Sequence, residues 1–299
     1  MGSPQFAIPI LSAIDKNFHL VTVVTQPDKP AGRGKKMEAS AVKKYAVDHN
    51  IPVLEPHKIR KEPETIEVLK SYQVDLFIVA AFGQILPLVV LEIPKFGCIN
   101  VHASLLPRWR GASPIQAAIL NGDLESGVTI MKMDAGMDTG PILKENSITL
   151  ASNETSESLS EKLSGLGREL LLEVVPDYLA SRIESIPQDD EEATYAPLIK
   201  KEDGQLDLHE PVEILERKIR ALNPWPGTFL QWNEKSLKIL EAEIIQSSPQ
   251  EIGKRKIHQK YPAIDCVGGT LVLKKVKAPG KNVVSGKDFL NGTRDWVGS

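Results

Sequence analysis

The sequence predicts an α/β protein in which a doubly wound, Rossmann-like N-terminal domain precedes a C-terminal, OB-like β-barrel domain. Apolar strand-like runs alternate with amphipathic helical segments up to about residue 180. The polar, acidic stretch 186–192 then breaks this pattern, and about five short β-patterned runs occupy the last hundred residues. We therefore expect a large domain at residues 1–182, a linker at 183–203 and a small domain at 204–299.

The first 182 residues alternate between helices and strands in a regular order. Ser3 is suited to cap a first helix that begins at Pro4. The run 75–81 is continuously apolar and is followed by Gly83, which is typical of a buried parallel strand. The remaining strands are expected at 20–25, 53–54, 98–102 and 127–133, and the remaining helices at about 39–49, 64–72, 113–120 and 155–179.

The start of the chain departs from this order. A doubly wound domain normally opens with a strand, whereas this sequence opens directly with a turn and a helix. That first strand is normally central, so its absence would leave strand edges without a partner, or a gap in the core. We expect either a misplaced start or a truncated, less stable chain. Met1-Gly2-Ser3 is also compatible with a cloning scar.

The C-terminal region has the pattern of a small antiparallel β-domain. A helix is expected at about 212–221, followed by strands at 228–232, 237–245, 256–257, 264–267 and 270–276. Asn233-Glu234 and Gly268-Gly269 fall where hairpin turns are needed.

Charge and cysteine content narrow the classes of function. The net charge is -3, but residues 1–199 sum to -7 and residues 200–299 to +4. A basic C-terminal part suits contact with a polyanion, although scattered surface charge explains it equally well.

Cys98 and Cys266 lie far apart, without disulfide or metal spacing, which favours a reducing compartment. Neither a signal peptide nor an apolar run of membrane length is present, so we expect a cytoplasmic protein without membrane contact.

Three polar residues form the candidate catalytic group. Asn100 and His102 are two positions apart on a predicted strand and so face the same side. Asp138 lies in a turn between Gly136 and Gly140, where close backbone approach to a ligand is possible. A carboxylate beside an imidazole raises the pKa of the histidine and fixes its tautomer. Asp134 is an alternative partner, and a lone histidine at a strand end is more often structural. The combination favours transfer of an acyl-like group.

Two loops flank this group. In the first, residues 104–111, Pro107 restricts the backbone, Arg108 and Arg110 are suited to hold an anion, and Trp109 is suited to stack or pack. The second, residues 27–36, is rich in Lys and Arg but lacks the Walker A spacing, which argues against a nucleoside triphosphate site. It is either a solvated loop or a contact for a polyanion. The Trp225 region, with its two prolines, is either a packing corner or a face between domains.

Taken together, the sequence motifs of this chain resemble those of the methionyl-tRNA formyltransferase family over essentially its whole length. The motifs that carry the resemblance are 2–4, 25–36, 98–116, 127–140 and 220–226. The resemblance implies formyl transfer from 10-formyltetrahydrofolate, as co-substrate, to the amino group of initiator methionyl-tRNA, for translation initiation. It also implies that no metal is needed, with 1–182 as the catalytic domain and 204–299 as the tRNA-binding domain. We expect a monomer.

The resemblance further implies roles for individual residues. Asn100 and His102 would donate hydrogen bonds to the oxyanion of the transfer step, and Asp138 would orient His102. The folate would lie against Phe82, Gly83, Gln84, Ile85, Leu86, Ser104, Leu105, Leu106 and Pro107. The tRNA would contact Arg33, Lys35, Lys36, Arg108 and Arg110.

Two other functions remain open from the sequence. A formyltransferase for a small amine, such as glycinamide ribonucleotide, would share the three polar residues but would need no basic C-terminal domain. A non-enzymatic RNA-binding protein would need no intact catalytic group.

Overall fold

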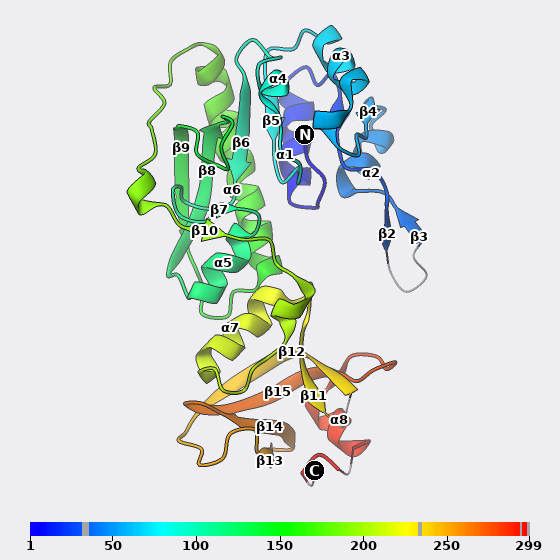
Figure 1. Ribbon diagram of the computed structural model, residues 1–299, viewed down its shortest axis with the longest axis vertical. Coiled ribbons are helices and arrows are strands. Elements are labelled where there is room, and N and C mark those ends of the chain that lie inside the picture. The colour runs from blue at the N-terminus through cyan, green and yellow to red at the C-terminus, as the bar shows by residue number, and fades with distance from the viewer. Residues whose placement is uncertain (32–35, 233–234, 294, 298–299) are drawn as a thin grey trace. The chain divides into compact units, whose positions relative to one another are not determined.

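The computed structural model describes residues 1–31, 36–232, 235–293 and 295–297. The chain divides into two compact units (Figure 1). Unit 1 comprises residues 1–114, 125–149 and 160–196, and unit 2 comprises residues 115–124, 150–159 and 197–299.

Unit 1 combines parallel and antiparallel strand pairs. A four-stranded sheet has the order β5-β6-β8-β9, in which β5 and β6 are parallel and β8 and β9 run antiparallel. Separate two-stranded pairs are β1 with β4, β2 with β3 and β7 with β10. The strands of this unit are β1 (Val23–Val24), β2 (Lys29–Ala31), β3 (Lys36–Glu38), β4 (Val53–Leu54), β5 (Phe77–Val79), β6 (Cys98–His102), β7 (Arg110–Gly111), β8 (Glu125–Lys132), β9 (Ile142–Thr149) and β10 (Tyr195–Ala196).

Helices surround the strands of unit 1. They are α1 (Ala7–Asn17), α2 (Ala41–Asp48), α3 (Pro63–Ser71), α4 (Leu88–Leu91), the greater part of α6 (Ser156–Leu179) and the short 3₁₀ helices η1 (Ile59–Lys61) and η2 (Asp190–Glu192). The first helix begins at Ala7, so the prediction that Ser3 caps it at Pro4 is wrong. The Ser3 hydroxyl instead accepts a hydrogen bond from the main-chain N–H of Gln26, at 3.1 Å, because the chain forms a turn before the helix starts.

The first two residues lie between strands β1 and β5. The Met1 ammonium donates to the carbonyl of Ile78 at 2.6 Å, and the Met1 carbonyl accepts from the N–H of Ala80 at 2.9 Å. On the other side, the N–H of Gly2 donates to the carbonyl of Val24 at 3.0 Å. A cavity of about 490 Å³ lies beside them, lined largely by apolar side chains of α1, β1, β5 and α6. Residues 1 and 2 therefore bridge β1 and β5 beside this cavity. Burial lowers the pKa of the Met1 ammonium to about 6.

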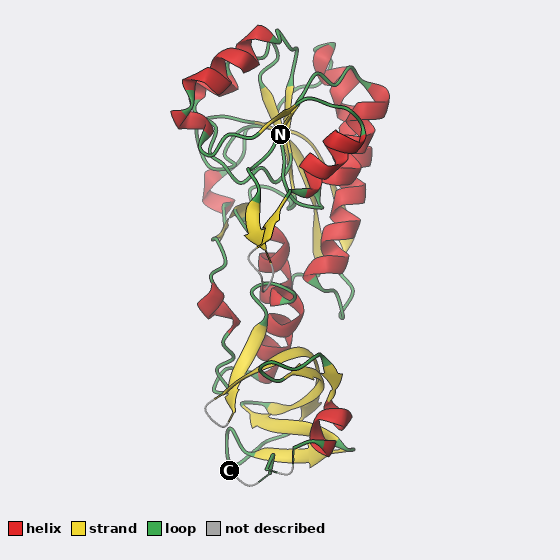
Figure 2. Cartoon of the chain, turned by 90° about the vertical axis from the view of Figure 1, so that its right-hand side faces the viewer, coloured by secondary structure: helices red, strands yellow, loops and turns green. Residues whose placement is uncertain are grey.

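Unit 2 contains a six-stranded antiparallel sheet, whose strands are yellow in Figure 2. The strand path is β11-β12-β15-β14-β13, with β16 paired to β15. Its strands are β11 (Thr228–Trp232), β12 (Lys235–Gln246), β13 (Arg255–His258), β14 (Tyr261–Cys266), β15 (Gly269–Lys277) and β16 (Val284–Ser285). Its helices are α5 (Pro114–Asn121, all but its first residue), η3 (Lys201–Gly204), α7 (Val212–Leu222) and α8 (Gly286–Asn291). Among the described residues the pairings form an open path, so the predicted β-sheet domain is confirmed without closure into a barrel.

Aromatic side chains complete the core of unit 2. Trp232, Phe289 and Trp296 pack on one another with ring centroids 5.4 to 6.2 Å apart. Trp296 is buried and donates its indole N–H to the carbonyl of Lys256 at 3.0 Å. These contacts join the last described segment of the chain to the sheet.

Most predicted elements are present with shifted ends. Strand β6 spans the predicted residues 98–102, whereas strands β2, β3, β7, β9, β10 and β16 and helices α4 and α8 were not predicted. Strand β9 has mostly exposed side chains, so it lacks the alternating pattern that identifies a half-buried strand. The predicted turn at 233–234 lies outside the described residues. Within the described part of the chain, no helix is both long and apolar enough to cross a membrane.

Candidate active site

Strand β6 brings two polar side chains into a buried position. Asn100 is 8% exposed and His102 is 5% exposed, and every other residue of the strand is buried too. Asn100 pairs with Val79 of β5 on one side and with Met131 of β8 on the other. Because the strand is central in its sheet, its backbone cannot shift without breaking hydrogen bonds on both sides. The two side chains therefore have a rigid base.

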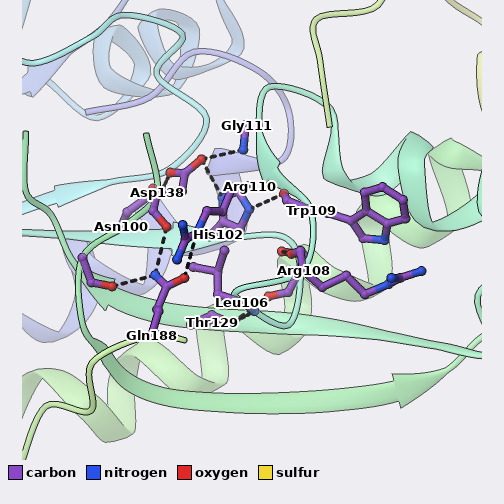
Figure 3. A network of polar contacts seen from close by, with 12 residues as sticks. Asn100, His102, Leu106, Arg108, Trp109, Arg110, Gly111, Thr129, Asp138 and Gln188 are labelled. Atoms are coloured by element: carbon purple, nitrogen blue, oxygen red, sulfur yellow. Dashed lines mark hydrogen bonds and ion pairs between the residues drawn. The ribbon is translucent and has the colours of Figure 1, made fainter. Parts of the chain in front are cut away.

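Asp138 meets both of these side chains (Figure 3). One carboxylate oxygen accepts from the amide of Asn100 at 3.4 Å, and the other lies 3.7 Å from Nδ1 of His102. The second oxygen also accepts a 2.8 Å hydrogen bond from the main-chain N–H of Gly111. The three predicted catalytic residues are thus adjacent in space, although the sequence separates them by up to 38 positions.

Asp134, the alternative partner of His102, has a different role. Its carboxylate accepts from the N–H of Gly136 at 3.0 Å and from the hydroxyl of Thr139 at 2.7 Å, and its side chain is exposed. These local bonds shape the turn that carries Asp138.

The second ring nitrogen of His102 fixes the tautomer. Nε2 lies 3.1 Å from the carbonyl oxygen of Trp109. A carbonyl oxygen can only accept, so this contact requires a proton on Nε2. The neutral ring then presents an unprotonated Nδ1 toward Asp138, and a second proton at Nδ1 would create an ion pair with the carboxylate.

A buried hydroxyl that was not predicted from the sequence holds the loop after β6. Thr129 is fully buried; its hydroxyl donates to the carbonyl of Ser104 at 2.7 Å and accepts from the N–H of Leu106 at 3.0 Å. The Ser104 hydroxyl in turn donates to the carbonyl of Arg108 at 2.6 Å. Thr129 lies opposite His102 in the β6–β8 pairing. Its hydroxyl inside an apolar run was the available signal.

The segment predicted to contact folate has a mixed environment. Phe82 and Leu86 are buried, while Ile85 is 76% exposed. The Gln84 side chain accepts from the N–H of Ile59 at 2.8 Å and donates to the carbonyl of Pro56 at 2.7 Å, so it holds its own loop. The carbonyl of Phe82 accepts from the Gln26 amide at 2.8 Å. The segment thus combines a fixed backbone with an exposed apolar side chain.

The residues predicted to contact tRNA are placed differently from one another. Arg33 and Lys35 lie outside the described residues, and for Lys36 only the backbone, in β3, is described. The Arg108 guanidinium lies over the Trp109 ring, 4.4 Å from its centroid. Arg110 is 1% exposed, and its guanidinium is bonded to other side chains of unit 1. A direct tRNA contact of Arg110 is therefore not favoured by this structure.

The site brings together an amide donor, an imidazole and a carboxylate. Such a set suits transfer of an acyl-like group, in which an oxyanion develops and a proton must move. Among the described residues, no group of three or more His, Cys, Asp and Glu side chains is placed to hold a metal ion.

Two family models match this chain. The model "Formyl transferase" matches residues 1–175, and "Formyl transferase, C-terminal domain" matches residues 198–294. The chain belongs to the formyl transferase family.

Relatives and solved structures agree with this assignment. The formyl transferase is 43% identical to a methionyl-tRNA formyltransferase of Myxococcus xanthus, covering all of this chain and 96% of the relative. It is also 43% identical to that of Methylococcus capsulatus, covering 97% of this chain and 94% of the relative. The resemblance predicted from the sequence is thus confirmed.

The fold is shared with a more distant structure. An N-formyltransferase of Helicobacter canadensis, solved with folinic acid and dTDP-3-aminofucose, matches with a TM-score of 0.67 and 20% identity. The match covers 91% of the formyl transferase and 96% of that chain.

Proposed function

We propose that this formyl transferase moves the formyl group of 10-formyltetrahydrofolate to the amino group of initiator methionyl-tRNA, for translation initiation. The observation that carries the proposal is the contact of Asn100 and His102, on the buried central strand β6, with Asp138, in the turn between β8 and β9. Full-length identity of 43% to relatives named methionyl-tRNA formyltransferase supports the choice of substrate.

The chemistry follows from the three side chains. The substrate amine attacks the formyl carbon, a new N–C bond forms, and the bond from that carbon to the folate nitrogen breaks. The Asn100 amide donates to the oxyanion that develops; one such donor contributes about 3 kcal/mol in other enzymes. His102 carries the proton from the amine to the departing nitrogen, which contributes roughly 10²–10⁴-fold. Asp138 stabilises the imidazolium that this transfer requires.

The His102 contact with the Trp109 carbonyl adds a condition. Nε2 is engaged by that carbonyl at 3.1 Å, so this nitrogen serves the substrate only when the contact opens. The carbonyl in that contact belongs to the loop of residues 104–111, so movement of this loop would release Nε2. We assign the folate to the side of the site formed by Ser104–Pro107 and Phe82–Leu86, as the family resemblance implies.

We assign tRNA binding to the positively charged side chains of the C-terminal domain and of the basic loop in unit 1. Residues 200–299 carry a net charge of +4, and the basic loop at Arg33, Lys35 and Lys36 adds cations in unit 1. We propose that the C-terminal sheet is an OB-like, tRNA-binding module at residues 204–299, joined through 183–203 to a Rossmann-like catalytic domain at 1–182. Binding should then weaken steeply with salt, because each phosphate contact releases counterions.

Comparison of His102→Ala with wild type tests the proposal. Formylation of methionyl-tRNA should fall by at least about 10²-fold, while the Kd for the tRNA stays within about twofold. His57→Ala is the matched control, since His57 is exposed and lies outside the site. Wild-type activity of His102→Ala would contradict the assignment. Formylation of glycinamide ribonucleotide but not of methionyl-tRNA by the wild-type chain would favour the small-amine enzyme instead.

A further inference from the structure

Residues 186–196 run alongside the candidate active site of unit 1 as a bonded segment, which we call the strap. Ile186 exchanges two backbone hydrogen bonds with Ile142 of β9, both 2.8 Å. At its other end, the main-chain N–H of Arg110 donates to the carbonyl of Thr194 at 2.9 Å, and Tyr195–Ala196 pair in parallel with Arg110–Gly111. The sequence predicts this stretch as part of a linker, yet it bonds to both loops that touch the catalytic residues.

Gln188 is the strap residue that connects those two loops. Its amide nitrogen donates to the carbonyls of Asp138, at 2.9 Å, and Gly140, at 2.7 Å. Its amide oxygen accepts from Nε of Arg110 at 3.0 Å. Figure 3 shows Gln188 beside the site residues, and the dashed lines mark its bonds. Both N–H groups and the oxygen are therefore used, and the opposite amide orientation would place an oxygen against two carbonyls.

The partner of Gln188 on the loop side is a buried guanidinium. Arg110 is 1% exposed and is also bonded to Asp190, at 2.8 Å, whose own side chain is 83% exposed. A buried guanidinium requires such partners, because an unpaired charge would be costly. Arg110 precedes Gly111, whose N–H binds the Asp138 carboxylate at 2.8 Å. One amide thus ties together the backbone that carries Asp138 and the strand that holds its carboxylate.

The backbone of Asp138 needs this support. Its φ is +55°, in the left-handed region that non-glycine residues adopt only where neighbouring structure holds them. The two bonds from Gln188 are the ones that hold the carbonyls of Asp138 and Gly140, whereas the Asp134 bonds hold only the start of the turn and Thr139. A displacement of about 1 Å at a reacting group can cost about 10²-fold in rate.

We propose that Gln188 is a positioning residue, which sets the Asp138 carboxylate against His102 by clamping the two loops. This inference rests on the proposed function and adds a residue from outside the three predicted catalytic positions. Gln188 acts through Asp138 and does not touch the substrates.

The first experiment separates positioning from binding. Gln188→Ala and Gln188→Glu should each lower kcat for methionyl-tRNA formylation by about tenfold or more, with KM values for both substrates within about twofold. Glutamate keeps the size and the acceptor for Arg110 but cannot donate to the two carbonyls, so its loss should match that of alanine. Glu192→Ala, an exposed change in the same strap, should keep the wild-type kcat.

The second experiment tests the route through Asp138. In an Asp138→Ala background, adding Gln188→Ala should change kcat by less than about twofold, because the carboxylate to be positioned is gone. Full multiplication of the two losses would overturn the proposal, as would a wild-type kcat in Gln188→Glu. Gln188→Met retains the side-chain volume and serves as the reporting variant if the alanine variant folds poorly.

A third measurement does not depend on activity. Hydrogen exchange of the Gly111 amide should speed up by about tenfold in Gln188→Ala, since its acceptor on Asp138 is no longer fixed. Unchanged exchange would refute the clamp. If the wild-type chain fails to formylate methionyl-tRNA while this exchange effect is present, the proposed function is wrong and the clamp stands.

Discussion

The main-chain N–H of Gly111 donates a 2.8 Å hydrogen bond to the carboxylate of Asp138, which joins two loops on either side of His102. This bond occupies the same carboxylate oxygen that lies 3.7 Å from Nδ1 of His102. The donor is a backbone group, so the position of this oxygen in front of the imidazole depends on no second side-chain donor. Orientation of the imidazole by Asp138 depends on that fixed oxygen.

Replacement of Asp138 by asparagine should separate its charge from its shape. The amide oxygen of the new side chain can still accept from Gly111, but it no longer stabilises a charged His102. We expect formylation to fall by about 10²-fold or more in kcat, with little change in KM. Asp134→Asn, in the same turn, should retain activity within about threefold, because an amide oxygen can still accept the bonds from Gly136 and Thr139. Equal losses in the two variants would contradict the assignment of Asp138.

Replacement of Thr129 by valine should loosen the loop after β6. The two side chains have nearly the same shape, but valine leaves the buried carbonyl of Ser104 and the N–H of Leu106 without the partner that Thr129 supplies. We expect a loss of about 1–3 kcal/mol in the free energy of unfolding, measured by urea denaturation. Thr149→Val, on the exposed end of β9, should cost less than about 0.5 kcal/mol. A stability loss at Thr149 as large as that at Thr129 would argue against the role of the buried hydroxyl.

The meeting of the three candidate catalytic residues could be predicted because the signals that mark them are local. Asn100 and His102 share a strand face through simple alternation, and the Gly136–Gly140 turn marks Asp138 as a residue near a ligand. Gln188 carries no such signal, because it stands in an acidic stretch whose composition resembles a linker. Its three bonds depend on the tertiary approach of Arg110 and the Asp138 turn, which no pattern in the sequence specifies.

The contrast between local sequence signals and tertiary contacts also explains which strands were predicted and why the burial of Arg110 was not. Strand β6 is predicted to the residue because apolar Cys98, Ile99 and Val101 occupy three of its five positions, whereas β9 escapes because most of its side chains face solvent. Arg110 looks like an anion-binding residue in the sequence, since charge normally marks the surface. The structure buries it instead, because Gln188 and Asp190 lie within hydrogen-bonding distance.

Both cysteine thiols should be inert in the folded chain. Burial raises the pKa of Cys98 to about 12 and that of Cys266 to about 11, from an ordinary value of 9.0. A thiol-specific reagent at about pH 8, below the ordinary thiol pKa, should therefore react slowly with native protein and fully once guanidinium unfolds it.

The raised pKa values of the two thiols also determine how the free energy of unfolding changes at alkaline pH. The folded state keeps these protons longer than the unfolded state, so their contribution to stability is complete below pH 9 and is lost as the pH rises through 11 to 12. In the Cys266→Ala variant, the free energy of unfolding measured by urea denaturation should therefore fall less between pH 9 and pH 11 than in the wild type. Rapid native reaction at both thiols would contradict their burial.

Two glycines of helix α6 provide a matched pair of variants that test how this helix packs on strand β6. A Cβ at Gly165 would meet nothing within 4 Å, whereas a Cβ at Gly167 would lie 2.7 Å from Cγ1 of Val101, between Asn100 and His102 on β6. Alanine at either position gains about 0.5–1 kcal/mol of helix propensity.

We expect Gly165→Ala to raise the free energy of unfolding by this amount. Gly167→Ala should lower it by about 1–3 kcal/mol, because Val101 is buried and its strand is bonded on both sides. The shift of β6 should also reduce kcat in Gly167→Ala alone. Equal stability of the two variants would mean that α6 does not pack tightly against Val101 of β6.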